Sequence, residues 1–293
     1  MSAAMPVPLR RLALACLLLV PFAGPAAARE RVFITSDGVR LHYTEQGPRD
    51  PSRGRIVHTI VFVPGLAMPG WIWAGQLAAF RDHDRVIAFD PRGQGSSQIA
   101  AGGYTAPRRG RDLAELLARL GPAPVLLVAW SLGVLDALAY VHAYGDRRLA
   151  GLVLVDNSVG ENPPPTWHPA PGPPPPYRVA MAGFVRGMFH TRQPAAWVDR
   201  LIVASLRLPP PDTRALRAYD EPRSFWRSAA EGFRPPLLYL VRPWLAAQAT
   251  NLQANRPGTE VAVFPHAGHA LFIDDPVRFD ALLRGFIRSR VWP

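Results

Sequence analysis

Residues 125–133 read VLLVAWSLG, and this stretch decides the fold. The run 125–128 is short and apolar, as in a strand buried on both faces, and residues 132–144 continue with a helical pattern. Ser131 stands at the junction, with alanine and glycine two positions to either side. Small neighbours permit the tight, strained turn that lifts a serine hydroxyl clear of a sheet. The stretch therefore predicts a nucleophilic Ser131; a serine that merely caps the helix is the alternative.

Apolar runs of the same kind alternate with helix-like stretches along the chain. Strands are predicted at 56–63, 86–89, 125–128, 152–155, 237–241 and 261–264, and helices at 71–80, 108–120, 132–144, 245–255 and 276–288. Residues 32–34 and 39–43 are predicted as a hairpin, because the Asp-Gly pair between them favours positive φ. The alternation predicts an α/β fold with a mostly parallel, doubly wound sheet of about eight strands.

The alternation is interrupted between residues 157 and 234. Proline clusters at 163–165 and 173–176 predict an irregular loop, because proline fixes φ and removes a hydrogen-bond donor. Helical patterns follow at 177–190, 194–206 and 213–230. We therefore expect a core domain of residues 29–156 and 235–293, with 157–234 inserted as a proline-rich loop and helical cap. A proline-rich linker is the alternative.

The first 28 residues have the pattern of a secretory signal peptide. Two arginines at 10–11 precede an apolar run at 12–22, and alanines occupy 26–28. The run is shorter than the roughly 20 apolar residues that span a bilayer. The pattern predicts cleavage after Ala28, a mature protein without a stable membrane span, and a periplasmic or secreted location. A membrane anchor is the alternative.

Composition limits the classes of protein and partner. The chain has 293 residues, 48% hydrophobic and 19% charged, which is typical of a globular protein with a substantial core. Its one cysteine, Cys16, lies in the predicted signal, so disulfides and cysteine chemistry are not expected in the mature chain. A lipoprotein modified at Cys16 is the alternative.

The net charge of the chain is +11, or +9 without the arginines at 10–11, but the arginines are spread along the sequence. This favours a solvated surface and argues against nucleic acid.

His269 is the second candidate for chemistry. It lies in the sequence PHAGHALF at 265–272, directly after the last predicted strand. An imidazole that titrates near neutrality can take the proton of a serine hydroxyl and return it to a leaving group. His266, which is closer to the strand, is the competing candidate.

Four motifs in order give the chain a resemblance to the α/β-hydrolase superfamily, of the serine hydrolase or carboxylesterase-like type. Besides Ser131 and His269, the sequence VPGL at 63–66 resembles the oxyanion loop of that family, and DPRGQGSS at 90–97 resembles its structural D-x-R-G-x-G-x-S turn. The resemblance implies that the backbone N–H groups of Leu66 and Leu132 bind an oxyanion. It implies no cofactor, and metal-ligand spacings are absent from the sequence.

The acid of the predicted site does not lie at the usual position. Relatives commonly place an aspartate after the strand that ends here at Val241, but the sequence continues Arg-Pro-Trp. Other relatives supply the acid after the preceding strand, which here runs into Asp156. A carboxylate there could orient His269 and stabilise its imidazolium. Asp156 is therefore the predicted acid, Glu161 is the reserve, and a purely local hydrogen-bonding role is the alternative.

These features together predict an enzyme that cleaves a carboxylic ester, or a related acyl bond, of a small molecule. Ser131, His269 and Asp156 would act as a triad and form an acyl-enzyme. Thioesterase, lactonase, carbon–carbon hydrolase, aminopeptidase and cofactor-free perhydrolase stay open as reaction types, because the fold does not determine the substrate. A non-catalytic binding protein with the same fold is the alternative from another class. The sequence does not indicate an oligomeric state.

Overall fold

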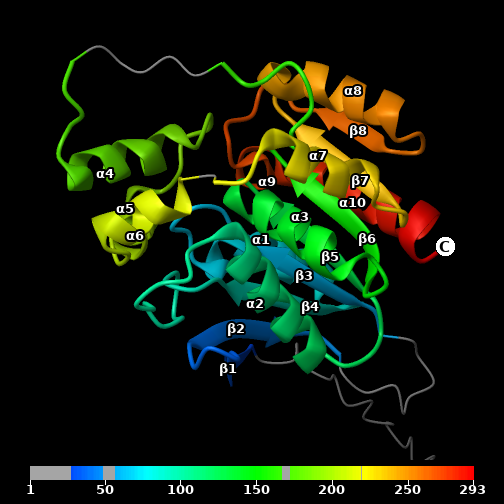
Figure 1. The fold of residues 1–293 in the computed structure, drawn as a ribbon, viewed down its shortest axis with the longest axis horizontal. Coiled ribbons are helices and arrows are strands. Elements are labelled where there is room, and N and C mark those ends of the chain that lie inside the picture. Colours follow the sequence, from blue (N-terminus) through cyan, green and yellow to red (C-terminus); the bar gives the residue numbers. More distant parts are fainter. Residues whose placement is uncertain (1–27, 49–56, 167–171, 219) are drawn as a thin grey trace, which may run out of the picture.

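The structure is a computed structural model that describes residues 28–48, 57–166, 172–218 and 220–293 (Figure 1). The predicted signal peptide lies outside the described residues except for Ala28. The described fold begins directly after the predicted cleavage site, with a strand that starts at Arg29. Within these ranges, no helix combines the length and the apolar character needed to cross a membrane.

One sheet of eight strands forms the centre of the protein, and it confirms the predicted α/β fold. Its spatial order is β1-β2-β4-β3-β5-β6-β7-β8. The strands are β1 (Arg29–Ile34), β2 (Arg40–Gln46), β3 (Thr59–Val63), β4 (Arg85–Asp90), β5 (Val125–Trp130), β6 (Leu149–Val155), β7 (Leu237–Val241) and β8 (Glu260–Val263). Strand β2 pairs antiparallel with β1 and β4, whereas the pairs from β4 through β3 to β8 are parallel.

Helices cover both faces of the sheet, as the alternation predicted (Figure 1). The core helices are α1 (Ala74–Phe80), α2 (Ala106–Arg119), α3 (Leu132–Tyr144), α8 (Ala246–Asn255), α9 (Leu271–Asp274) and α10 (Pro276–Phe286). Alternate residues of a strand point to opposite faces, so Val61 packs in the cluster with α2 and α3, and Phe62 packs in the cluster with α1 and α10. A strand with two buried faces reads as a continuous apolar run, which explains why these strands were predictable.

Small differences from the predicted helices have local causes. Helix α2 begins at Ala106, two residues earlier than predicted, because a proline is tolerated in the first turn, where its missing N–H is not needed. The predicted helix 213–230 is wrong, because the structure has two helices there, α6 (Pro210–Leu216) and α7 (Arg223–Glu231). Pro222 precedes α7, and a proline at that position interrupts a helix.

The helices of the inserted segment 157–234 lie in two different places. Helices α4 (Tyr177–Gly187), α5 (Ala195–Ser205) and α6 lie together to one side of the sheet, and we call them the cap helices (Figure 1). Helix α7 instead packs on α3 of the core. The apolar face of α7, formed by Trp226, Ala229 and Ala230, is buried there. This spacing of three and four residues places the three side chains on one side of the helix.

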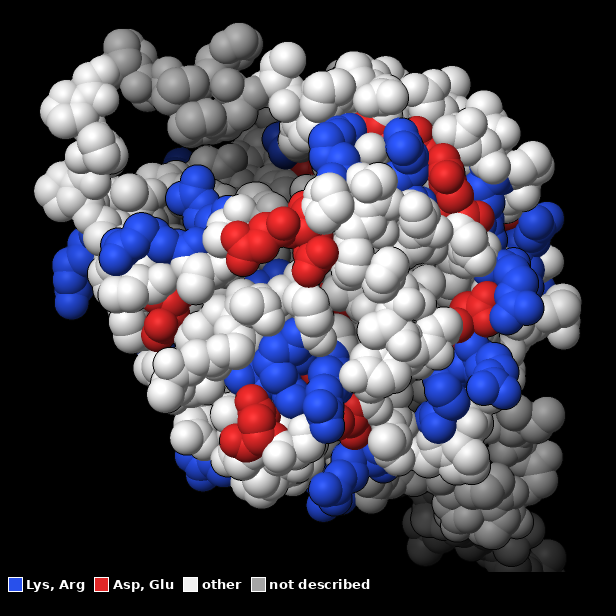
Figure 2. Space-filling view, in the orientation of Figure 1, with Lys and Arg blue, Asp and Glu red and all other residues white. Residues whose placement is uncertain are grey.

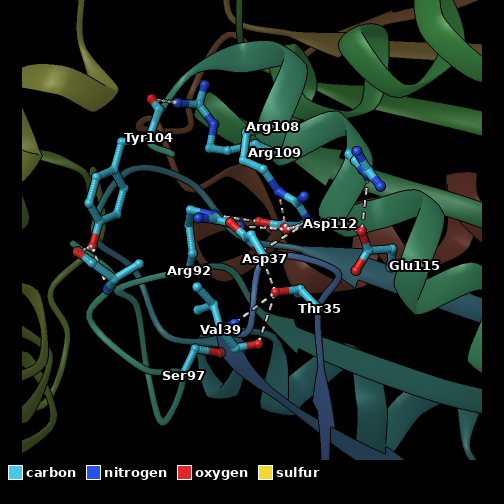
Figure 3. A network of polar contacts seen from close by, with 12 residues as sticks. Thr35, Asp37, Val39, Arg92, Ser97, Tyr104, Arg108, Arg109, Asp112 and Glu115 are labelled. Atoms are coloured by element: carbon cyan, nitrogen blue, oxygen red, sulfur yellow. Dashed lines mark hydrogen bonds and ion pairs between the residues drawn. The ribbon is translucent and has the colours of Figure 1, made fainter. Parts of the chain in front are cut away.

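The tight group of arginines at the start of α2 is engaged within the fold (Figure 3). Arg108 bonds Asp112 at 2.7 Å and Glu115 at 2.9 Å, and Arg109 bonds the buried Asp136 at 2.6 Å. Asp112 also holds Arg92, whose side chain is fully buried, at 2.6 Å. On the face seen in Figure 2, basic and acidic side chains are interspersed and not gathered into one basic surface.

Candidate active site

Ser131 occupies a strained turn between β5 and α3. Its φ of 55° and ψ of −122° lie where a residue with a side chain rarely goes, and such strain costs on the order of 1–3 kcal/mol. Two glycines make room for the turn. A Cβ on Gly65 would come within 2.8 Å of the Ser131 Cβ, and a Cβ on Gly133 would come within 2.8 Å of the Pro64 carbonyl oxygen. Larger residues would push the turn out of place.

The structure brings together the three side chains that the sequence singled out. The Ser131 Oγ lies 2.8 Å from the His269 Nε2, and the His269 Nδ1 lies 2.7 Å from the Asp156 Oδ2. Asp156 is 1% exposed, whereas His269 is partly open to a cavity. The order serine, imidazole, buried carboxylate allows a proton to pass from the hydroxyl to the ring while the carboxylate orients the ring.

The two reserve candidates lie elsewhere. His266 is exposed and does not line the cavity at Ser131. Glu161 is buried, but its Oε1 accepts a hydrogen bond from the Asn255 side chain at the end of α8. Of the histidines and carboxylates considered from sequence, His269 and Asp156 are the ones next to Ser131.

Arg242 occupies the position where relatives commonly have the acid. Its backbone N–H donates to the Asp156 Oδ1 at 3.0 Å, and its Nε donates to the Asp156 Oδ2 at 2.6 Å. The β6 and β7 strands are neighbours, so the residues that follow them meet at the same edge of the sheet. The position after β7 is therefore occupied by the cation of Arg242, which binds the carboxylate of Asp156 after the neighbouring strand β6.

Two backbone N–H groups near Ser131 have no protein acceptor in the described part of the chain. Leu132 is the first residue of α3, where an N–H has no partner within the helix. Leu66 lies in the loop after β3 and lines the same cavity as Ser131 and His269. Its N–H does not donate to any described group. These are the two donors that the sequence predicted for an oxyanion.

Gln94 holds the loop that carries Leu66, and this role was missed in the sequence. The Gln94 Oε1 accepts from the Ala67 N–H at 2.7 Å, and its Nε2 donates to the carbonyl groups of Gly65 and Met68 at 3.1 and 3.2 Å. The side chain is 3% exposed. The signal was present, because Gln94 lies in the turn at 90–97, but its contacts cross 26 to 29 residues of sequence.

Three further side chains support the turn and the base. The Asn157 Nδ2 donates to the Ser131 carbonyl oxygen at 2.8 Å, and the Tyr239 hydroxyl donates to the Asn157 carbonyl oxygen at 2.6 Å. Burial raises the pKa of Tyr239, which keeps this hydroxyl protonated as a donor. The Trp130 Nε1 donates to the His269 carbonyl oxygen at 2.8 Å. The serine and histidine are thus held through their backbones.

A cavity of about 760 Å³, which we call the cap cavity, opens above Ser131 and His269. Helices α4 and α6 contribute much of its wall, including the apolar residues Met181 and Phe184, and Met188 directly after α4 also lines it. Its volume is in the range of sites for small molecules. Among the described residues, no group of three or more histidine, cysteine, aspartate or glutamate side chains could hold a metal ion.

A mostly parallel sheet between helices, with a serine at a strained strand–helix turn that is hydrogen-bonded to a histidine, defines a protein of the α/β-hydrolase type. The alpha/beta hydrolase family matches residues 60–282, which is more than half of the chain. The chain belongs to this family, and the resemblance predicted from its sequence is confirmed.

Individual curated proteins match a shorter part of the chain than the family does. A non-heme chloroperoxidase of Kitasatospora aureofaciens is 36% identical over 122 residues, which cover 41% of this chain and 42% of that protein. A bifunctional esterase/perhydrolase of Acinetobacter calcoaceticus is 30% identical over the same length and shares of each chain. The alignment thus spans about two fifths of these curated relatives.

Solved structures match over most of their length. A Burkholderia cenocepacia protein that is provisionally assigned as an aryl esterase superposes with a TM-score of 0.75 and 26% identity, and the match covers 89% of this chain and 98% of that one. An esterase from Rhodococcus has a TM-score of 0.72 at 23% identity, which shows likeness of fold.

Proposed function

We propose that the protein is a serine hydrolase that cleaves the carboxylic ester bond of a small molecule. The observation that carries this proposal is the pair of short contacts at His269, with Ser131 on one ring nitrogen and the buried Asp156 on the other. Membership of the alpha/beta hydrolase family and the esterases among its structural neighbours support the same reaction. The apolar wall of the cap cavity suits an organic substrate.

In the proposed first half-reaction, the Ser131 Oγ attacks the ester carbonyl carbon while His269 takes the hydroxyl proton. The N–H groups of Leu66 and Leu132 stabilise the negative charge that develops on the carbonyl oxygen. The ester C–O bond then breaks, and His269 gives its proton to the departing alkoxide. The products of this step are the free alcohol and a serine ester of the enzyme.

In the second half-reaction, water attacks the serine ester and His269 takes its proton. The acid is released, and the proton returns to Ser131. Asp156 holds the ring so that Nε2 faces Ser131 in both halves, and its negative charge stabilises the imidazolium. Asp156 is oriented in turn by two donors from Arg242.

A fluorophosphonate probe and a chromogenic ester test this proposal. We expect the wild-type protein to be labelled and to hydrolyse 4-nitrophenyl butyrate, and Ser131→Ala to do neither. Asp156→Asn should retain the fold but lose about 10³–10⁴-fold in kcat. Glu161→Gln is the matched control and should keep near-normal turnover. Folded wild-type protein that is neither labelled nor active would favour the non-catalytic binding protein.

Perhydrolysis is a second candidate, favoured by the esterase/perhydrolase and the chloroperoxidase among the relatives. Hydrogen peroxide would then replace water as the nucleophile that attacks the serine ester, releasing a peracid and restoring the serine. Peracid formation from acetate ester and hydrogen peroxide measures this activity. Its loss in Ser131→Ala is expected, because both reactions need the same serine ester.

We also propose that the protein acts in the periplasm or outside the cell. This rests on the signal-like pattern of the first 28 residues, and β1 begins at Arg29, so cleavage after Ala28 would leave the strand whole. Sequencing the N-terminus of the exported protein tests it, with Arg29 as the expected first residue. An uncleaved protein that stays in the cytoplasm would contradict it.

A further inference from the structure

The wall of the cap cavity carries more positive than negative charge. Its lining residues include Arg214, Arg217 and Arg242 and one acidic residue, Asp156, and both Arg214 and Arg217 are exposed. Asp156 is already bonded to Arg242 and His269. In the described part of the chain, neither Arg214 nor Arg217 has an ion pair or a side-chain hydrogen bond. Two cations therefore line the cavity without a counter-charge.

Arg214 lies in the last turn of α6, Arg217 directly follows that helix, and both border the cavity. Pro210, Thr213, Arg214 and Arg217 all line it, and their spacing of three, four and seven residues places them on one side of a helix. Hydrogen bonds to the start of α4 fix the position of this helix. The Thr213 Oγ1 lies 2.9 Å from the Tyr177 hydroxyl at the start of α4, and that hydroxyl donates to the Leu208 carbonyl oxygen at 3.0 Å.

An arginine in the last turn of a helix, as Arg214 is in α6, is often explained by its favourable interaction with the negative end of the helix dipole. That reason does not account for the presence of both Arg214 and Arg217 in the lining of this cavity. Arg214 and Arg217 share one cavity with Arg242 and the reacting Ser131, and the remaining wall is largely apolar. Such a lining fits a ligand with an apolar body and an anionic end.

We propose that the substrate is an ester that also carries a carboxylate, which Arg214 and Arg217 bind while Ser131 attacks the ester carbonyl. This inference rests on the proposed esterase function and names the substrate class. The charge can belong to the acyl part or to the alcohol part of the ester. Hydrolysis then releases a dicarboxylic acid in the first case and a hydroxy acid in the second.

Two pairs of esters distinguish a carboxylate in the acyl part of the substrate from one in the alcohol part. The 4-nitrophenyl monoester of glutaric acid is compared with 4-nitrophenyl pentanoate, and the acetyl ester of 4-hydroxybenzoate is compared with phenyl acetate. In the double variant Arg214→Gln/Arg217→Gln, we expect kcat/KM for one anionic ester to fall about tenfold and that for its neutral partner to change less than about twofold. Added salt should lower the wild-type value for the same anionic ester.

Arg178→Gln is the matched control, because Arg178 lies on cap helix α4, is exposed and does not line the cavity. It should leave all four values unchanged. Binding is measured separately, by titrating the Ser131→Ala protein with the anionic and neutral esters, and the arginine substitutions should weaken binding of the anionic ester alone. Equal effects on charged and neutral esters, or no effect on either anionic ester, would overturn the inference. Ser131-dependent turnover of the neutral esters would leave the esterase proposal standing in that case.

Discussion

The Arg242 Nε and the Asp156 Oδ2 lie 2.6 Å apart, and the same oxygen accepts the hydrogen bond of the His269 Nδ1 at 2.7 Å. Two donors thus share one carboxylate oxygen. The Arg242 side chain thus orients Asp156, which in turn orients the imidazole of His269. Arg242 is therefore expected to act as a positioning residue for the acid of the site.

Arg242→Leu removes the Nε donor to the Asp156 Oδ2. We expect kcat on a neutral ester to fall about tenfold with little change in KM, because one donor fewer then orients Asp156 against His269. Arg242→Lys retains a cationic donor and should recover part of the lost kcat. An unchanged kcat in Arg242→Leu would contradict a positioning role for Arg242.

Gln94→Leu tests the support of the oxyanion loop. Without the three hydrogen bonds of Gln94, the Leu66 N–H should lose its alignment, so kcat on a neutral ester is expected to fall about ten- to a hundredfold with little change in KM. Gln248→Leu is the matched control. Gln248 is also buried and bonds the Pro163 carbonyl oxygen, but it does not line the cap cavity. A similar fall in kcat in both variants would assign the effect to general loosening of the fold.

Substitution of Asp112 tests the contribution of the buried ion pairs in Figure 3 to stability. Its carboxylate binds Arg92 through two contacts, at 2.6 and 2.8 Å, and Arg92 is fully buried. Asp112→Ala leaves that guanidinium without its main partner, so the free energy of unfolding should fall by about 3–5 kcal/mol. The partly exposed Glu115 is the control, and Glu115→Ala should cost less than about 1 kcal/mol. Urea unfolding measures both, and equal losses would contradict the prediction.

His42 should make stability depend on pH. Its Nδ1 lies 2.8 Å from the Asp90 Oδ2, and this hydrogen bond raises the pKa of His42 above 6.5, against the opposing effect of burial. Because the folded state binds the proton more tightly than the unfolded state, the stabilisation is fully present below about pH 6.5 and is lost as the pH rises through the higher folded pKa.

The comparison of His42→Gln with wild type measures this effect. Wild type should exceed the variant in free energy of unfolding by more at pH 6 than at pH 9. His266→Gln, a substitution of an exposed histidine, is the control and should differ from wild type by the same small amount at both values. A difference for His42→Gln that does not depend on pH would argue against charged pairs of His42 with Asp90 and with Glu30, whose Oε2 lies 2.6 Å from the His42 Nε2.

The amino-acid sequence by itself was enough to predict the parallel sheet, the turn at Ser131 and the meeting of Ser131 with His269 and Asp156. The sheet and the turn depend on local patterns, because buried strands are continuous apolar runs and the turn needs small neighbours. The places of Asp156 and His269 were what the resemblance to the α/β-hydrolase superfamily implied. The predicted helix at 213–230 is wrong, because α6 ends at Leu216 and Pro222 precedes the start of α7.

The tertiary structure alone decided which side chains surround these residues. Arg242 reaches Asp156 across 86 residues of sequence because β6 and β7 lie side by side. Gln94 reaches the loop of Leu66 in a similar way, and Arg214 and Arg217 face the cap cavity because α6 packs against the start of α4. Hydrogen bonds and charge pairs of this kind depend on distances in space, and a sequence pattern contains no distance between residues far apart in the chain.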